Sequence, residues 1–327
     1  MTRNIIRKIF LFLLFILAVS FIAFILMDLS PIDPIAAFAR DRSIALTQAQ
    51  KQKLIFEWGL DKPLLTRYVY WIKHLLTGDL GVSNIYLMPV IDVIKIGFTS
   101  SIILMLLSWI LQFVIGVPLG IIAGSNLYSK KDNIIKTFAI IIGSTPTYWI
   151  GILLIIIFSL KLKLLPASMA SSAGILEEDI LFTDRLEHII LPAITMAIAG
   201  SSNLILHTRS KSEEILNSDY VIYAKSKGIS KKDILFKYAF RNLIVPAITI
   251  QFASFSEIFS GTIIAENVFN YPGLGNLTIE AGIRGDVPLL LGLVLFSSIF
   301  VYVGNRISDL LYTLIDPRQR SKNGISK

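Results

Sequence analysis

The chain offers few side chains suited to covalent or metal chemistry. It contains no cysteine and only three histidines, His74, His188 and His207, none of them paired at metal-ligand spacing. It has no G-x-x-x-x-G-K-[ST] phosphate-binding loop and no Ser, His and Asp group at a recognised catalytic spacing. We therefore expect no catalytic residue, metal site or bound cofactor in this chain.

One carboxylate lies in an unusual setting, because Glu257 interrupts the apolar residues 242–265. A charge in hydrocarbon is costly unless it is paired, protonated or facing water. Glu257 could line a substrate path, with Asn203 and Ser254 as further candidates, or it could make a structural hydrogen bond within the chain or to a partner subunit. The hydroxyl groups considered for that bond are Ser254, Ser256 and Thr262.

The elements that carry these residues are expected to be membrane helices. Of 327 residues, 54% are apolar and 17% are charged, against about 25% charged in soluble domains. Six blocks approach the length of about 20 apolar residues that a spanning helix needs. These blocks are residues 9–27, 96–129, 137–160, 188–208, 242–265 and 288–305. The composition thus predicts an all-α polytopic membrane protein with six transmembrane helices.

Basic residues predict the orientation of the spans, since lysine and arginine accumulate in cytoplasmic loops. The N-terminus, the second-to-third connection, the fourth-to-fifth connection and the C-terminal tail are all basic, and six spans place them on one side. The third-to-fourth loop is acidic, with Glu177, Glu178, Asp179, Asp184 and Glu187. Both termini are therefore expected inside. The net charge of +8 is explained by topology without a nucleic-acid partner. Residues 9–27 exceed the length of a signal-peptide core, which favours a retained helix.

Residues 30–97 are too polar to span and too long for a simple turn. Thr47 and Gln50 fit a capping box, and Gly59 is a plausible helix end. The stretch after Pro63 places apolar residues on one helical face: Leu64, Tyr68, Trp71, Ile72 and Leu75. A packing helix is favoured here, with an interfacial helix or a docking platform as the alternative.

The fourth-to-fifth loop carries a turn with readable local chemistry. Gly228 suits the left-handed position that ends a helix. Ser230 and Asp233 fit a capping box that starts a second helix. A DNA-binding helix-turn-helix is disfavoured, because such a module needs a third supporting helix and free access to a DNA groove, whereas here membrane spans follow within a few residues on both sides.

The same loop carries a family resemblance. Tyr223, Ala224, Gly228 and Pro246 resemble the signature of ABC-importer permeases, E-A-A, three spacers, G, nine spacers, I-x-L-P, with Ile222 in place of the glutamate. Peptide-type members commonly tolerate that replacement. "LSPIDPIAAF", "GVPLGIIAG", "NVFNYPGLGNL" and "LIDPRQR" also occur in order. The chain resembles the B-type subunit of the oligopeptide, dipeptide and nickel permease group, with the type I importer fold.

The resemblance implies a division of labour. The partners would be a homologous C-type permease, two ABC ATPase subunits that use ATP, and an extracytoplasmic substrate-binding protein, in the bacterial cytoplasmic membrane. It implies three segments: residues 1–29 with the first span, an extracytoplasmic segment 30–98, and a five-helix core 99–327 with a coupling loop at about 209–242. The residues implied in coupling to the ATPases are Tyr220, Tyr223, Ala224, Lys225, Gly228, Ile229, Ser230, Asp233 and Arg241.

The substrate stays open at this level. Peptide importers are favoured, and a nickel or metal-chelate importer of the same family is the alternative. A secondary transporter, the candidate from another class, would not need the Gly228 loop.

Overall fold

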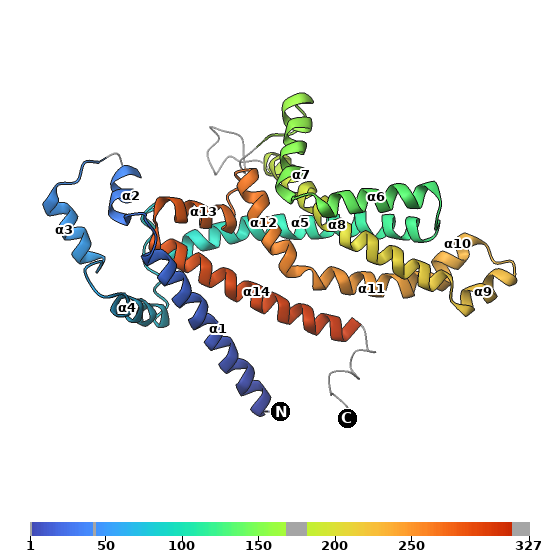
Figure 1. The fold of residues 1–327 in the computed structure, drawn as a ribbon, viewed down its shortest axis with the longest axis horizontal. Coiled ribbons are helices and arrows are strands. Elements are labelled where there is room, and N and C mark those ends of the chain that lie inside the picture. Colours follow the sequence, from blue (N-terminus) through green and yellow to red (C-terminus); the bar gives the residue numbers. More distant parts are fainter. Residues whose placement is uncertain (1, 42–43, 168–181, 316–327) are drawn as a thin grey trace. The chain divides into compact units, whose positions relative to one another are not determined.

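The computed structural model describes residues 2–41, 44–167 and 182–315, and this part of the chain is almost entirely helical (Figure 1). Its extended pairing is limited there to one isolated bridge between Val82 and Pro89. The acidic residues Glu177, Glu178 and Asp179 and the basic C-terminal tail lie outside these ranges. The helices are α1 Thr2–Asp28, α2 Pro34–Asp41, α3 Gln48–Glu57, α4 Leu64–Leu76, α5 Val90–Gly124, α6 Lys130–Ser144, α7 Thr147–Leu154, a π-helical segment Ile155–Lys161, α8 Phe182–Leu216, α9 Asp219–Ser226, α10 Lys231–Asp233, a second π-helical segment Ile234–Ala239, α11 Phe240–Ala253, α12 Phe255–Val268, α13 Leu274–Arg284 and α14 Val287–Ile315.

Six predicted spans correspond to four single helices and two bent pairs. The single helices are Ile6–Asp28, Val90–Gly124, Arg185–Leu216 and Val287–Leu311. The pair Lys130–Ser144 and Thr147–Lys161 is bent by 107°, and the pair Lys231–Ala253 and Phe255–Val268 by 54°. The prediction of a six-span helical membrane protein is confirmed, but the third and fifth spans are broken.

The sharper bend has a local cause in the sequence. Pro146 precedes α7 and Thr145 before it is extended, with φ −95° and ψ 127°. A residue before proline is driven out of the helical region by the proline ring, and proline has no N–H to continue the ladder. The helix therefore ends at Ser144 and restarts in a new direction.

The helices belong to two compact units. Unit 1 contains residues 1–101 and 272–302, and unit 2 contains residues 102–271 and 303–327. Helices α5 and α14 each pass from one unit to the other.

In unit 1, the loop before α5 is anchored by a buried carboxylate. Asp286 is 0% exposed, and its Oδ2 atom accepts hydrogen bonds from the Ser83 hydroxyl at 2.6 Å and the Ile85 N–H at 3.0 Å. The Tyr86 hydroxyl donates to Glu280 at 2.7 Å. Burial, together with that hydrogen bond, raises the pKa of Tyr86. The loop is thereby held against the turn between α13 and α14.

The short helices of unit 1 confirm the cap predictions. Thr47 and Gln50 form the complete capping box of α3. Gly59, with φ +64°, follows the C-cap residue Trp58. On α4 the predicted packing face is half-buried.

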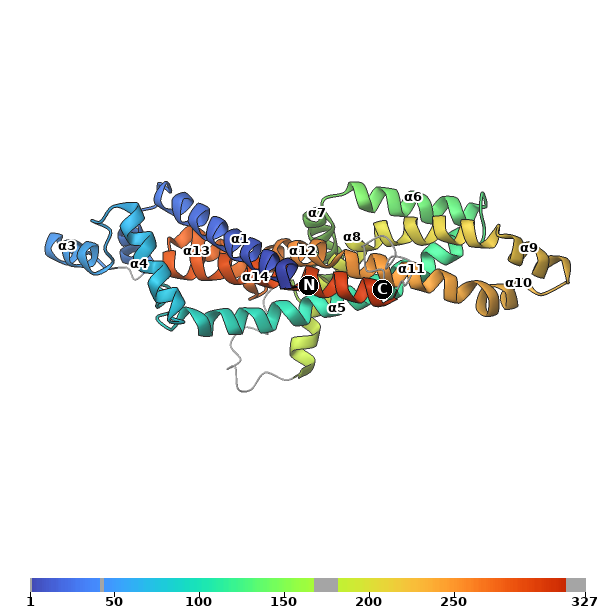
Figure 2. The ribbon, with the colours of Figure 1, turned by 90° about the horizontal axis from the view of Figure 1, so that it is seen from below.

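Unit 2 is built around α8, against which α5 and α6 pack (Figure 2). Three glycines of α5 meet α8: Gly116 faces Leu204, Gly120 faces Thr208 and Gly124 faces Ser212. A Cβ atom at Gly120 would lie 2.8 Å from the Ile205 carbonyl oxygen, so the backbones approach too closely for a side chain. On the α6 side, the Ser202 hydroxyl donates to the Ala139 carbonyl at 2.7 Å.

Candidate functional site

The turn at Gly228 ends α9 in a Schellman motif. Gly228 has φ +75°, which a residue with a Cβ atom adopts only with strain. Its N–H donates to the Lys225 carbonyl at 3.0 Å, and the Ile229 N–H donates to the Ala224 carbonyl at 3.3 Å. These two bonds satisfy carbonyl groups that the helix end would leave unpaired.

Beneath the turn lies a small apolar cluster. Val221, Ala224 and Ile234 are at most 2% exposed, and Leu216 and Ile229 pack against them. Leu216 is the last residue of α8, so the cluster joins α9 to the end of that long helix. The turn is therefore packed against the end of α8 through these side chains.

The second helix after the turn is longer than the sequence suggests. Ser230 caps it, accepting from the Asp233 N–H at 3.1 Å, and the Ser230 hydroxyl donates to the Asp233 carboxylate at 2.7 Å. From Lys231 the helix runs without a break to Ala253, through a π-helical segment. The second helix is therefore not a short separate element, and a buried cluster of Ile215, Ala239 and Leu243 supports its continuation. The turn therefore leads from α9, which packs on the end of α8, into the fifth span.

The outer face of this loop is exposed and mixes aromatic and basic side chains. Tyr220 is 42% exposed, Ile222 53% and Tyr223 61%. The Lys227 ammonium lies 4.5 Å from the Tyr223 ring centroid. Arg241 is exposed as well. Ile222, which stands at the position of the motif glutamate, is exposed and is not part of the apolar cluster. The change from glutamate to isoleucine at this position therefore leaves the buried packing of the loop unaffected.

Several side chains tie the loop to its neighbours. Lys225 donates to the Leu216 carbonyl at 3.0 Å, and Lys231 donates to the Asn126 side chain at 3.0 Å. Tyr220 accepts a hydrogen bond from Asn242 at 2.9 Å. Figures 1 and 2 show α9 and the turn to α10 at one tip of unit 2.

An ion pair near this tip was missed by the sequence reasoning. Asp132, at the start of α6, is 1% exposed and binds Arg209 of α8 through two bonds, Nε to Oδ1 at 2.6 Å and Nη2 to Oδ2 at 2.8 Å. The Tyr128 N–H also donates to Asp132 at 2.9 Å. Neither residue was a candidate in the sequence analysis; the available signal was a single acidic residue, Asp132, among the lysines that precede the apolar block 137–160.

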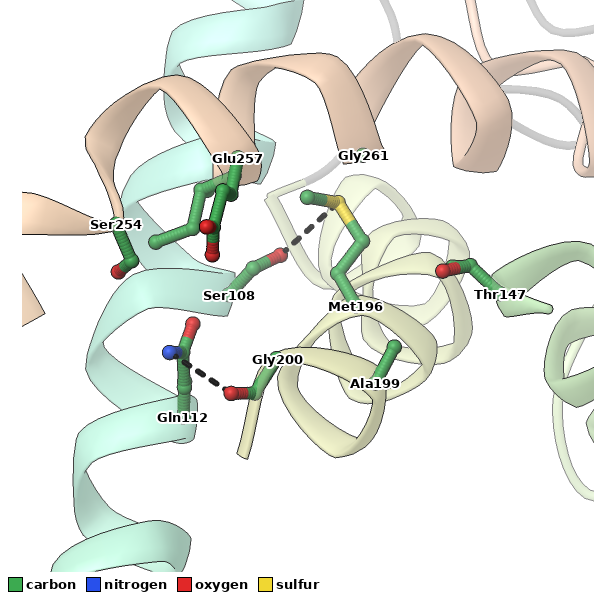
Figure 3. A pocket seen from close by; sticks show the side chains of 10 residues that line it. Ser108, Gln112, Thr147, Met196, Ala199, Gly200, Ser254, Glu257 and Gly261 are labelled. Atoms are coloured by element: carbon green, nitrogen blue, oxygen red, sulfur yellow. Dashed lines mark hydrogen bonds between the residues drawn. The ribbon is translucent and has the colours of Figure 1, made fainter. Parts of the chain in front are cut away.

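In unit 2, a pocket of about 190 Å³ lies among four membrane helices, and five of its ten lining residues are polar (Figure 3). It is lined by Ser108 and Gln112 of α5, Thr147 of α7, Met196, Ala199 and Gly200 of α8, Ser254 between α11 and α12, and Glu257, Ile258 and Gly261 of α12. The bends bring Thr147 and Glu257 to the pocket, because each lies within the first turn after a break. Broken helices thus supply its polar groups.

Glu257 extends its carboxylate into this pocket (Figure 3). Within the described residues it has no hydrogen bond or ion pair, and its side chain is exposed in the single chain. The three neighbouring hydroxyl groups donate elsewhere: Ser254 to Gln251, Ser256 to Asn305 and Thr262 to Phe259. The carboxylate is therefore left available to a ligand, to water or to another subunit.

The two other path candidates differ in position. Ser254 is 7% exposed and lines the pocket. Asn203 lies on an exposed face of α8 and does not line it. Gln112 was not anticipated; its side chain donates to the Gly200 carbonyl at 3.1 Å and borders the pocket.

The broken spans, the pocket among them and the exposed loop define a polytopic helical membrane protein. A solved chain from an inward-facing crystal form of the MetNI methionine ABC transporter has the same fold, with a TM-score of 0.53 at 14% identity, covering 69% of this chain and 97% of that chain.

Sequence comparison gives the family. Residues 116–321 match the binding-protein-dependent transport system inner membrane component family. The oligopeptide transport system permease protein AppB of Bacillus subtilis is 34% identical over 84% of this chain and 86% of its own length. The dipeptide transport system permease protein DppB of Escherichia coli is 31% identical, with 83% and 85% covered. The chain belongs to the family of binding-protein-dependent transport system inner membrane components, and it is a multi-pass membrane protein with the type I importer fold.

Proposed function

We propose that this chain is a permease subunit of an ATP-driven importer of dipeptides or oligopeptides in the bacterial cytoplasmic membrane. Its family membership and the names of its relatives AppB and DppB support this function. Both relatives are named for peptides, which favours peptides over nickel complexes as the substrate.

The observation that carries the proposal is the construction of the loop around Gly228. A loop that transmits force needs an exposed contact surface and a rigid attachment to the spans. Tyr223 and Ile222 supply exposed surface, whereas Ala224 and Ile234 are buried against the end of α8. In this proposal a separate ATPase subunit seats against the exposed face, and closure of the ATPases moves α8 and α11 together.

Within the loop, the residues divide into two groups by exposure. Ala224, Gly228, Ile229, Ser230 and Asp233 shape the turn and its cluster. Tyr220, Tyr223, Lys225 and Arg241 present exposed side chains toward the ATPase. ATP is bound and hydrolysed by the partner subunits, and this chain contributes no catalytic group.

The translocation path is proposed to form between this chain and a homologous C-type permease, with substrate delivered by an extracytoplasmic binding protein. Glu257 and Ser254 of the pocket face this path, and Asn203 contacts it from the exposed face of α8. Residues 1–29, 30–98 and 99–327 act as anchor, outer segment and permease core. The carboxylate of Glu257 suits a cationic group such as a peptide ammonium.

The experiment is ATP-dependent uptake into proteoliposomes that contain this chain and its four partner subunits. Uptake of a labelled dipeptide or oligopeptide, abolished when ATP or the binding protein is omitted, is expected. Binding of peptide pools and of nickel complexes to the cognate binding protein identifies the substrate class. Transport of nickel complexes without any peptide uptake would contradict the peptide assignment.

A further inference from the structure

Helix α4 of unit 1 is attached to the side of α1, the first span. The Tyr68 hydroxyl lies 2.9 Å from the Ser20 hydroxyl and donates to the Leu17 carbonyl at 3.2 Å. The Tyr68 ring lies 5.0 Å from the ring of Phe21 and 5.5 Å from that of Phe24, between centroids. The contact residues on α1 are therefore part of its uncharged stretch.

The depth of this contact follows from the length of α1. Residues 9–27 are uncharged and lie between Lys8 and Asp28. At 1.5 Å per residue they extend about 28 Å, close to the ~30 Å of bilayer hydrocarbon, which leaves little freedom to slide. In the orientation predicted from the basic loops, Asp28 then marks the outer boundary. Phe21 and Phe24 lie about 6 to 11 Å below it along the helix axis.

The charged group of α4 turns toward that boundary. This group is Arg67, whose Nη1 atom forms an ion pair with the Asp28 carboxylate at 2.6 Å. Its guanidinium carbon lies 5.6 Å from the centroid of Phe24. An arginine that reaches from the apolar level to the interface is the expected behaviour of a side chain at a membrane surface.

Helix α4 carries an exposed apolar stripe beside the face that contacts α1. Leu65 is 64% exposed, Val69 51% and Leu76 81%. Leu65, Val69 and Leu76 follow helical spacing along one stripe, which Lys73 shares. In a water-exposed cap, such a stripe would leave apolar surface in contact with water, which is unfavourable. Aliphatic side chains beside a single lysine instead suit the boundary between lipid headgroups and acyl chains.

From this placement we propose that α4 is an interfacial helix, embedded in the outer leaflet with Leu65, Val69 and Leu76 against phospholipid. On α1, the apolar side chains Leu13 and Leu17 are likewise 54% and 47% exposed. The helix braces the outer end of the first span within the bilayer. This inference is independent of the transported substrate.

The absence of cysteine from the chain makes the test direct. Single substitutions Leu65→Cys and Val69→Cys carry a nitroxide label in the assembled transporter, with partner subunits made cysteine-free, in phosphatidylcholine and phosphatidylglycerol nanodiscs. Collision rates with oxygen, which partitions into lipid, and with a water-soluble nickel chelate give the depth of each label. Leu13→Cys in α1 is the lipid control, and Lys51→Cys on the exposed polar surface of α3 is the aqueous control.

The expected result is that labels at positions 65 and 69 collide preferentially with oxygen, as at position 13 and in contrast to position 51. Preferential collision with the nickel chelate at 65 and 69 would overturn the proposal, because the face would then be in water. Low collision rates with both reagents would overturn it as well, since they would show that a protein subunit covers the stripe. Normal peptide uptake by each variant confirms that the labelled protein is folded.

Discussion

Replacement of Gly228 by alanine tests the turn that leads from α9 into the fifth span. Gly228 has φ +75°, and a Cβ atom there would meet nothing within 4 Å. The penalty is therefore conformational and not steric: about 1–2 kcal/mol for a left-handed residue with a Cβ atom. About 0.4–1 kcal/mol is offset by the smaller entropy of the unfolded chain. A net destabilisation of about 1 kcal/mol follows. It corresponds to a roughly fivefold larger population of the opened turn, since 1.36 kcal/mol corresponds to a factor of ten.

Hydrogen exchange measures this opening directly. The amides of Gly228 and Ile229 donate to Lys225 and Ala224, so their protection should fall by that factor in Gly228→Ala. Gly228→Val, in which a β-branched residue is forced to positive φ, should lose more protection. We also expect Gly228→Val to reduce retention of the ATPase subunits on the purified permease and to lower peptide uptake per ATP hydrolysed.

The control is another glycine with open space around it. Gly282, inside α13, also meets nothing within 4 Å but is not at positive φ. Gly282→Ala should be neutral or stabilising by up to about 1 kcal/mol, because alanine favours a helix interior. If Gly228→Val kept full uptake and ATPase association, the assignment of this loop to coupling would be refuted.

Three further perturbations test the ion pair, the helix packing and the pocket. Asp132→Ala removes the buried partner of Arg209, which is left with the longer contact of its Nη1 atom to Glu213 at 3.5 Å. It should cost about 3 kcal/mol, measured as a lower melting temperature by size-exclusion chromatography after heating. Asp309→Ala, which removes an exposed pair, should cost about 1 kcal/mol at most, and equal losses would contradict the role of burial. Gly120→Val should prevent α5 from packing on α8 and yield aggregated protein, whereas a wild-type elution profile would show that the close approach is not required. Glu257→Gln should alter the affinity or rate of peptide uptake without loss of folded protein, and an unchanged KM and maximal rate would exclude it from the path.

Local structure was readable from the sequence where one or two residues decide it. Gly228 and Gly59 adopt the expected left-handed conformation, and Ser230 and Thr47 cap the expected helices. In each case a backbone preference or a short hydrogen bond acts within a few residues, so no distant contact is needed. The apolar blocks predicted the membrane spans for a similar reason, because lipid imposes length and composition on any helix that crosses it.

The sequence by itself therefore determined the helical membrane class, the capped short helices and the glycine turn. Tertiary structure alone decided which polar residues meet: it placed Glu257 with Ser108 and Gln112, set Asn203 apart from them, and paired Asp132 with Arg209. Asp132 and Arg209 are separated by 77 positions, and nothing in local propensity relates them. The physical reason is that a helix presents its residues in several directions, and only its packing against other helices selects the direction in which each side chain finds a partner.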